Sequence, residues 1–336
     1  MRYIIYGAGA VGGAIGGRLA RAGHDVTLIA RGAHLEALRT GGLRLVTPDE
    51  DLHPVVAVAG SPAEAAPEPG DMVVLAMKAQ GTEAALGELE AVAGAQVAVV
   101  CAQNGVDNER MAARRGFATY AMCVVIPATH LEPGVVHLHA APVAGILDVG
   151  RYPGGTDATA ERLAADLRSA AFESRADGEI MRWKYAKLLN NLGNALDAAV
   201  GAGSRRSDLF GQALAEGAAC YEAAGIDYAR PDEDLDRRAA MSPLRAAGGV
   251  AHQGSSSWQS LARSTGTIEA DWLNGEIVLL GQLHGVATPV NEVLRRVANR
   301  MARQRLAPGS LSLRAIEEEV RQFERGGAAG ANRGTA

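Results

Sequence analysis

The chain has 336 residues, a formal net charge of −5 and an apolar share of 48%, which predicts a folded protein of two domains. Charges of both signs are spread along it without a basic block, which argues against a nucleic-acid partner. The three cysteines are odd in number and far apart, so they predict neither a disulfide framework nor a zinc site and suit a reducing cytoplasm. No apolar run approaches the roughly 20 residues that span a membrane, and we expect a soluble, cytoplasmic protein.

Residues 1–31 have the pattern of a strand, a glycine turn, a helix and a second strand. An apolar strand over 3–6 precedes the turn, a helix over 13–22 follows it, and the next strand covers 25–29. In this context G-x-G-x-x-G predicts a dinucleotide site, because the glycines allow a tight turn, close approach of a pyrophosphate and close helix packing. The helix N-terminus then favours the phosphates. The predicted cofactor-binding turn is Gly7, Ala8, Gly9, Ala10, Val11 and Gly12.

Arg31 indicates which dinucleotide is bound. Enzymes of this kind that prefer NAD usually carry Asp or Glu at the end of the second strand, where this chain has Ile29 and Ala30 followed by Arg31. A carboxylate would repel a 2′-phosphate, whereas an arginine can bind it bidentately. We therefore predict NADP(H). A solvated arginine at the start of the next helix (34–39) is the alternative.

Further strands are predicted at 43–46, 55–59, 71–76 and 96–101, with 118–129, 135–139 and 144–149 extending the sheet in mixed orientation. A helix follows at 156–169, and 172–175 is the last predicted strand. From Asp177 onward the pattern is helical. The sequence thus predicts an α/β fold with an N-terminal Rossmann-like dinucleotide-binding domain (1–176), an all-helical C-terminal domain (177–325) and a disordered Gly/Ala-rich tail (326–336).

Two polar residues follow buried strands of the predicted sheet. Lys78 comes after the strand at 71–76, and Asn104 comes after the strand at 96–101. Ligands of open α/β sheets bind beyond the carboxyl ends of the strands, so both residues are candidates for the site. Asn104 also belongs to an Asn-Gly pair, which is common in turns without any chemical role.

A long helix predicted over 178–199 carries a second polar group. Lys187, Asn191 and Asn194 fall at i, i+4 and i+7 and share one face. Asparagine is a poor residue inside a helix, so this face predicts a polar cleft wall rather than a solvated surface. Further along, Ser257 lies in a serine run that suits a helix start, and Glu269 lies near the start of another long helix.

His137 and His139 alternate on a predicted strand and would share one face. Two such ligands without a third make a metal site improbable. We therefore expect no metal and a surface strand at this place.

Taken together, these stretches resemble the ketopantoate reductase (2-dehydropantoate 2-reductase) family over nearly the whole chain. The motifs occur in the family's order. They are the glycine turn with Arg31, Met77-Lys78-Ala79-Gln80, Gln103-Asn104-Gly105, Trp183 with Lys187-Leu188 and Asn191, Ser257, Ile268-Glu269-Ala270-Asp271, and His284 to Pro289 with Asn291.

The resemblance implies two domains with the active site between them, and hydride transfer from NADPH to the C2 carbonyl of a 2-oxo acid. Lys187 would be the general acid, and Glu269 would orient it or bind a substrate hydroxyl. The implied substrate-binding residues are Asn104, Asn191, Asn194 and Ser257. The implied cofactor-binding residues besides the glycine turn are Arg31, Lys78, Asn104 and Glu269.

The chain departs from the family pattern at two positions of the second domain. Typical members carry asparagine where this chain has Ala195, and aspartate where it has Leu261. The cofactor motifs are intact, so these departures bear on the substrate. Lys184, three residues before Lys187, stays open as an alternative acid.

Three alternatives remain at this stage. The first is an imine-forming or β-hydroxyacid dehydrogenase of similar plan, and the second is a non-catalytic NADP(H) sensor. The third is a flavin enzyme, although those folds generally have an acidic residue near Ala30. The sequence leaves the oligomeric state open and is compatible with a homodimer.

Overall fold

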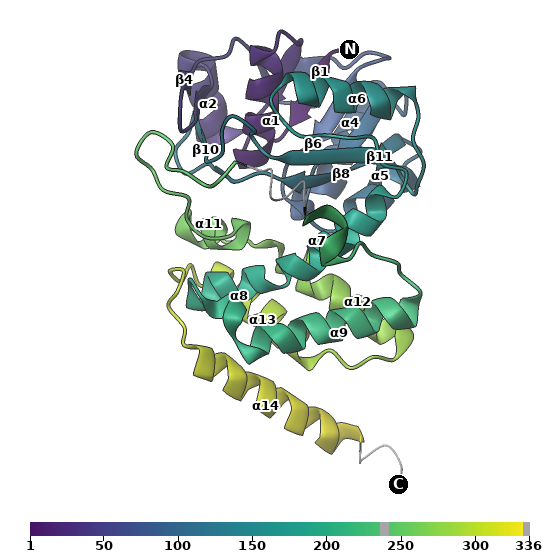
Figure 1. Cartoon of the computed structure of the whole chain (residues 1–336), viewed down its shortest axis with the longest axis vertical. Helices are drawn as coiled ribbons and strands as arrows, with labels where there is room; N and C mark the ends of the chain where they lie inside the picture. The colour runs from purple at the N-terminus through teal and green to yellow at the C-terminus, as the bar shows by residue number, and fades with distance from the viewer. Residues whose placement is uncertain (236–241, 332–336) are drawn as a thin grey trace. The chain divides into compact units, whose positions relative to one another are not determined.

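The computed structural model describes residues 1–235 and 242–331, which form two compact units (Figure 1). The first unit contains 1–185 and 228–252, and the second contains 186–227 and the chain from 253 onward. The division therefore falls after Tyr185 rather than at Ala176, and a later segment returns to the first unit. That return was not predicted, because it depends on distant partners such as Asp49, whose carboxylate lies 2.6 Å from Arg245.

The core of the first unit is a seven-stranded sheet. All neighbouring strands are parallel except the pair β11–β8, which is antiparallel. The predicted Rossmann-like fold with a mixed edge is thus confirmed, and the central strands are continuous apolar runs because both faces are covered. In spatial order the strands are β11 (Ile146–Arg151), β8 (Ala118–Val125), β7 (Ala98–Cys101), β6 (Met72–Leu75), β1 (Tyr3–Tyr6), β2 (Val26–Ile29) and β5 (Ala57–Ala59).

A smaller sheet lies in the same unit. The prediction that 135–139 extends the main sheet was wrong, because this segment pairs with the strand that begins at Arg44. The strand predicted over 118–129 is broken at Pro127, which has no N–H to donate. Residues 172–175 contribute one isolated bridge rather than a strand. The four strands of the smaller sheet are β4 (Asp51–Leu52), β3 (Arg44–Val46), β10 (Val135–Leu138) and β9 (Ala128–Thr129).

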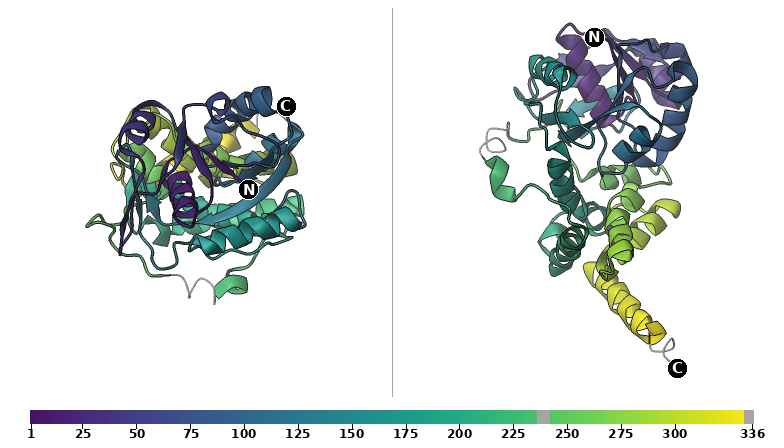
Figure 2. Two further views of the ribbon diagram at one scale, coloured as in Figure 1. Left: turned by 90° about the horizontal axis from the view of Figure 1, so that it is seen from above. Right: turned by 90° about the vertical axis from the view of Figure 1, so that its right-hand side faces the viewer.

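Helices cover both faces of the large sheet (Figure 2). Alternation along β1 places Tyr3 and Ile5 in one apolar cluster with α1 and α6, and Ile4 in a second cluster with α3, α4 and α5. The helices of this unit are α1 (Ala10–Arg21), α2 (Gly32–Gly41), α3 (Pro62–Ala65), α4 (Thr82–Ala93), α5 (Asn108–Arg114) and α6 (Ala158–Ser169), with the short turns η1 (Ala79–Gly81) and η3 (Pro231–Asp234).

The second unit is helical in its described residues, as predicted. Its apolar core includes Leu196, Leu294 and Ile316, all fully buried. The helix α7 (Ile180–Asn191) leads into it from the first unit. The remaining elements are α8 (Gly193–Val200), η2 (Ser204–Arg206), α9 (Asp208–Ala224), α11 (Ser256–Ala262), η4 (Glu269–Trp272), α12 (Asn274–His284), α13 (Pro289–Arg303) and α14 (Leu313–Ala331).

The C-terminal segment differs from the prediction of a disordered tail from residue 326. Helix α14 continues through 326–331, although this stretch contains three glycines, which have low helix propensity, beside three alanines. The rest of the predicted tail, 332–336, lies outside the described residues. Within 1–235 and 242–331, no helix combines the length and the apolar character needed to cross a membrane.

Candidate active site

The first unit brings the predicted cofactor residues other than Glu269 to one edge of its large sheet; Glu269 lies in the second unit. The glycine turn follows β1, Arg31 follows β2, Lys78 follows β6 and Asn104 follows β7. These four strands are adjacent and parallel in the order β7-β6-β1-β2, so their carboxyl ends lie side by side. This is the edge at which open α/β sheets bind their ligands.

The geometry of the glycine turn fits a dinucleotide. Gly7 has φ of +104°, and a Cβ on Gly12 would lie 2.1 Å from the carbonyl oxygen of Gly7. A Cβ on Gly9 would meet nothing within 4 Å, so the space above it is open. Helix α1 begins at Ala10 with no side-chain cap and no acidic residue in its first turn. Its first N–H groups can therefore face an anion such as a pyrophosphate.

Arg31 is the N-cap residue of α2 and is largely exposed. Its guanidinium is paired with Glu88 of α4, at 2.6 Å, and donates to the hydroxyl of Tyr6. Local pattern cannot predict this partner, because Glu88 lies 57 residues further along the chain.

A chain of buried hydrogen bonds holds the loop that carries Asn104. The side chain of Gln103 donates to Thr82 Oγ1 at 2.7 Å, and Thr82 donates to Asn108 Oδ1 at 2.8 Å. Asn108 in turn donates to the carbonyl of Asn104 at 3.1 Å. Asn104 itself is half-buried, as is Lys78 directly before η1. Sequence reasoning named Gln103 only as part of a motif and missed Thr82 and Asn108.

Lys184 and Lys187 lie in different surroundings. Lys184 is 3% exposed and forms an ion pair with Glu109, which is fully buried. Lys187 is half-buried. Because the ammonium of Lys184 is enclosed and paired, it is poorly placed to serve as the proton donor to a substrate. This burial argues against Lys184 as the acid, and the role of Lys187 stays a prediction.

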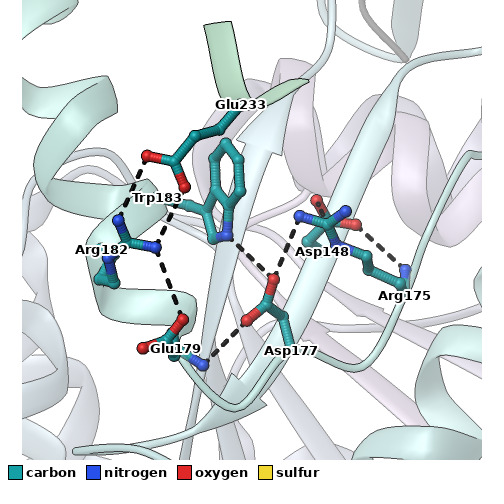
Figure 3. Close-up of polar contacts among 7 residues, drawn as sticks. All are labelled: Asp148, Arg175, Asp177, Glu179, Arg182, Trp183 and Glu233. Atoms are coloured by element: carbon teal, nitrogen blue, oxygen red, sulfur yellow. Dashed lines mark hydrogen bonds and ion pairs between the residues drawn. The ribbon is translucent and has the colours of Figure 1, made fainter. Parts of the chain in front are cut away.

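The start of α7 is fixed by a network of charges and one indole (Figure 3). The indole N–H of Trp183 donates to Asp177 at 2.9 Å, and the guanidinium of Arg175 lies 5.0 Å from the centre of the Trp183 ring. Arg182 binds Glu233, 3.2 Å away, from the segment that returns to the first unit. Trp183 therefore orients the helix rather than contributing a reactive group.

The helix predicted over 178–199 is two helices, which are separated at Leu192. Lys187 and Asn191 both belong to α7, where i and i+4 share a face. Asn194 belongs to α8, after a break at Leu192. Directly after the break, a Cβ on Gly193 would lie 2.9 Å from the ring of Phe210, so this position suits glycine.

A buried amide network stabilises this break. The side chain of Asn274 donates to the carbonyl of Leu192 at 3.1 Å and to Asn291 Oδ1 at 3.0 Å. Asn291 is bound by Glu216, which also accepts the backbone N–H groups of Val290 and Asn291 at the start of α13. Asn291 thus has a structural role, and sequence reasoning missed Asn274 and Glu216.

The remaining predicted site residues of the second unit are buried. Asn194 is 4% exposed and accepts a hydrogen bond from Arg205 at 2.5 Å. Ser257 is 3% exposed in the first turn of α11, and Ser255 is the cap of this helix, as its pattern predicted. Glu269 is 6% exposed at the start of η4. The amide nitrogen of Asn191 is buried and has no hydrogen-bond partner among the described residues.

The histidine pair differs from the expected surface strand. His139 is fully buried, and its ring is 2.9 Å from the hydroxyl of Thr129. The expectation of a surface position was wrong for this residue, because it follows the end of β10 and its ring packs between Thr129 and His252. In residues 1–235 and 242–331, no group of three metal-ligand side chains is close enough to hold an ion.

Comparison with known proteins agrees with this geometry. Residues 3–154 match the family described as ketopantoate reductase PanE/ApbA, and residues 179–302 match its C-terminal domain. The 2-dehydropantoate 2-reductase of Halobacterium salinarum is 30% identical over 88% of this chain and 96% of its own length. The chain belongs to the ketopantoate reductase family.

Solved structures support the same assignment. The PanE/ApbA family ketopantoate reductase of Ralstonia eutropha JMP134 is 28% identical over 91% of this chain and 99% of that chain, with a TM-score of 0.76. A D-mandelate dehydrogenase in a ternary complex with NADH and anilino(oxo)acetate has the same fold, at 22% identity over 91% of this chain and 99% of that chain, with a TM-score of 0.76. As a ketopantoate reductase family member, the chain is an NADP-dependent oxidoreductase that acts on a CH–OH group, with NADP(H) as its cofactor.

The two departures from the ketopantoate reductase pattern lie in the core of the second unit. Ala195 and Leu261 are each 3% exposed and belong to the same apolar cluster. An asparagine and an aspartate at these positions would place polar groups in that cluster. The two changes therefore keep this core apolar, and they carry less information about the substrate than the sequence suggested.

The lysine content gives one further signal. The chain has 33 basic residues, of which only Lys78, Lys184 and Lys187 are lysines. An arginine cannot give up its proton in a protein, whereas a lysine can. Lysine at 78 and 187 is therefore compatible with proton transfer, but Lys184, which is buried and paired, shows that lysine in this chain also serves structure.

Proposed function

We propose that the chain reduces a branched 2-oxo acid, with 2-dehydropantoate as the first candidate, to the corresponding 2-hydroxy acid. The family match carries this proposal, because it covers both units and includes the half-buried Lys187 and the buried Glu269. The relatives named 2-dehydropantoate 2-reductase match nearly the full chain, which supports pantoate as the product.

The first unit would bind the cofactor. The N–H groups at the start of α1 would bind the pyrophosphate above Gly9, and Arg31 would bind the 2′-phosphate of the adenosine. Lys78 and Asn104, at the ends of β6 and β7, would lie near the nicotinamide. When bound, NADPH supplies the hydride that reaches C2 of the substrate.

The predicted site residues of the second unit would bind the substrate and transfer the proton. As the C2 carbonyl accepts two electrons, its oxygen becomes negatively charged, and the ammonium of Lys187 would stabilise this oxygen and donate a proton to it. The neutral amine would then recover a proton from solvent. Glu269 would orient Lys187, and the amides of Asn191 and Asn194 and the hydroxyl of Ser257 would position the substrate.

Steady-state assays with NADPH and a panel of 2-oxo acids test this proposal. We expect turnover of 2-dehydropantoate, and a loss of about 10²–10⁴-fold in kcat in the variant Lys187→Ala, the range typical of general acid catalysis. The same panel with ammonium or amines tests the imine-forming alternative. Wild-type protein that binds NADPH but turns over no substrate would favour the sensor instead.

We further propose a cytoplasmic location and a homodimer. All three cysteines are free and buried, which suits a reducing compartment. Leu279 and Leu283 are exposed one turn apart on α12, at 44% and 67%, and we take this pair as the candidate contact surface. Sedimentation analysis of the wild type and of Leu279→Lys/Leu283→Lys checks the dimer, which the double variant should lose.

A further inference from the structure

Arg31 lies in a cluster of three side chains with Tyr6 and Glu88, here named the Arg31 cluster. One guanidinium nitrogen of Arg31 donates to both carboxylate oxygens of Glu88, at 2.8 and 2.6 Å, and to the hydroxyl of Tyr6 at 2.8 Å. The hydroxyl of Tyr6 donates to Glu88 at 2.5 Å. Each member thus contacts the other two, and the carboxylate of Glu88 has two donors.

The cluster supplies a carboxylate near the end of β2, where the chain itself has no acidic residue. Enzymes that bind NAD usually have Asp or Glu at the end of the second strand, where it binds the ribose 2′-hydroxyl. In this chain β2 ends at Ile29, and Glu88 instead brings a carboxylate to Arg31 from the middle of α4. The site therefore combines the arginine of an NADP enzyme with the acidic group of an NAD enzyme.

The charges of the cluster are stable near neutral pH. The hydrogen bond from Tyr6 holds the pKa of Glu88 below its usual range, so this group remains a carboxylate. Burial raises the pKa of Tyr6, so its hydroxyl stays protonated and continues to donate. The side chains of Arg31 and Glu88 are 60% and 43% exposed, so a ligand can reach both.

A 2′-phosphate and Glu88 compete for the same guanidinium. The phosphate must either displace the carboxylate from Arg31 or remain beside it, and like charges in contact are unfavourable. A ribose hydroxyl has no such conflict and can donate to the carboxylate. The presence of Glu88 therefore lowers the advantage that Arg31 gives to the phosphorylated cofactor.

We propose that Glu88 is a selectivity-determining residue that competes with the 2′-phosphate for Arg31 and allows the site to accept NADH as well as NADPH. This proposal rests on the proposed binding of NADP(H) at the glycine turn and Arg31. It adds that the cofactor preference of this chain is modest, and that the preference is set by a residue outside the glycine motif.

Calorimetric titration with 2′,5′-ADP and 5′-ADP tests the role of Glu88 without turnover. In Glu88→Gln we expect the affinity for 2′,5′-ADP to rise about fivefold, the equivalent of one surface ion pair, with the affinity for 5′-ADP unchanged or lower. Glu90→Gln is the matched control, because Glu90 lies on the same helix and pairs with Arg115. It should leave the ratio of the two affinities unchanged. Arg31→Ala should lower the affinity for 2′,5′-ADP and change the affinity for 5′-ADP little.

The outcomes separate this proposal from the proposed function. If the affinity for 2′,5′-ADP relative to that for 5′-ADP is unchanged or lower in Glu88→Gln, the role of Glu88 is overturned, even if the wild type reduces 2-oxo acids. Wild-type protein that binds neither nucleotide overturns the cofactor site and, with it, this proposal. Absence of 2-oxo acid turnover with a raised ratio in Glu88→Gln overturns the substrate assignment alone. In the active enzyme, the same variant should raise kcat/KM with NADPH relative to NADH.

Discussion

Lys184 and Glu109 form a buried ion pair at the carboxyl end of β7, with exposed side-chain fractions of 2% and 0%. The ammonium of Lys184 also donates to the carbonyl of Gln103 at 3.0 Å and lies 3.5 Å from the carbonyl of Cys101. Burial raises the pKa of Glu109, and the positive charge of Lys184 opposes this effect. The pair thus anchors α7 to the strand end that leads into Asn104.

Removal of one partner should destabilise the protein strongly. In Lys184→Met the carboxylate of Glu109 stays buried without its cation, and we expect the free energy of unfolding to fall by about 3–5 kcal/mol. The double variant Lys184→Met/Glu109→Leu should recover most of this loss, because no unpaired charge remains. Denaturant unfolding measures both.

Lys187→Met is the control for this experiment. Lys187 lies on the same helix and is half-buried, so its removal should change the free energy of unfolding by less than about 1 kcal/mol. Opposite results for the two lysines, with Lys187 the more costly to remove, would contradict the assignment of a structural role to Lys184.

The glycine turn allows folding and cofactor binding to be separated. Gly9→Ala adds a methyl group into open space, so stability should change by less than about 0.5 kcal/mol. NADPH should bind at least about tenfold more weakly, because the methyl group holds the pyrophosphate away from the backbone. Fluorescence titration with NADPH measures this loss.

Gly12→Ala should, in contrast to Gly9→Ala, destabilise the fold. Its Cβ would lie 2.1 Å from the carbonyl oxygen of Gly7, and we expect a loss of stability of about 1–3 kcal/mol. Gly41→Ala, at the open end of α2, is the neutral control. Unaltered NADPH binding in a well-folded Gly9→Ala protein would exclude the glycine turn as the phosphate site.

The sequence predicted those parts of the fold and site that depend on local pattern. The glycine turn, Arg31 and Asn104 each follow an apolar strand, and the order of these segments defines the edge of a parallel sheet. The partners that fix these residues come from far along the chain, as Glu88 does for Arg31. Pattern alone cannot pair such residues, because only the tertiary fold brings them together.

The helix break at Leu192 illustrates the same limit. The local pattern over 178–199 favours one continuous helix. At the break, the carbonyl of Leu192 accepts a hydrogen bond from the side chain of Asn274, 82 residues later. The predicted face of Lys187 and Asn191 survives, because both precede the break, whereas Asn194 follows it.

Leu261 should affect stability rather than substrate choice. It is buried in the apolar cluster that also contains Ala195, and Leu261→Ala should lower the free energy of unfolding by about 2–5 kcal/mol. Because we place Leu261 in the core and not against the substrate, the ratio of kcat/KM values for a small and a branched 2-oxo acid should stay within about twofold of the wild type. A lost substrate contact worth about 1.4 kcal/mol would change this ratio tenfold. A change of tenfold or more in that ratio would show that Leu261 contacts the substrate.

His139 should make the stability of the first unit depend on pH. Its ring is fully buried against Thr129, with the rings of His252 and His137 at 5.1 and 6.4 Å. Burial lowers the pKa of His139 to about 4, compared with about 6.5 in an unfolded chain. Between these two values the unfolded chain binds a proton that the folded chain does not.

The free energy of unfolding should therefore fall as the pH is lowered from about 6.5 to 4, by up to about 3 kcal/mol from this group. His139→Gln keeps a polar group toward Thr129 but has no ring to protonate. The free energy of unfolding, measured by denaturant at several pH values across this window, should therefore change less with pH in this variant. His53→Gln, at an exposed position, should keep the wild-type slope. If the free energy of unfolding depends equally on pH in the wild type and in His139→Gln, the pKa of His139 is not lowered in the folded protein.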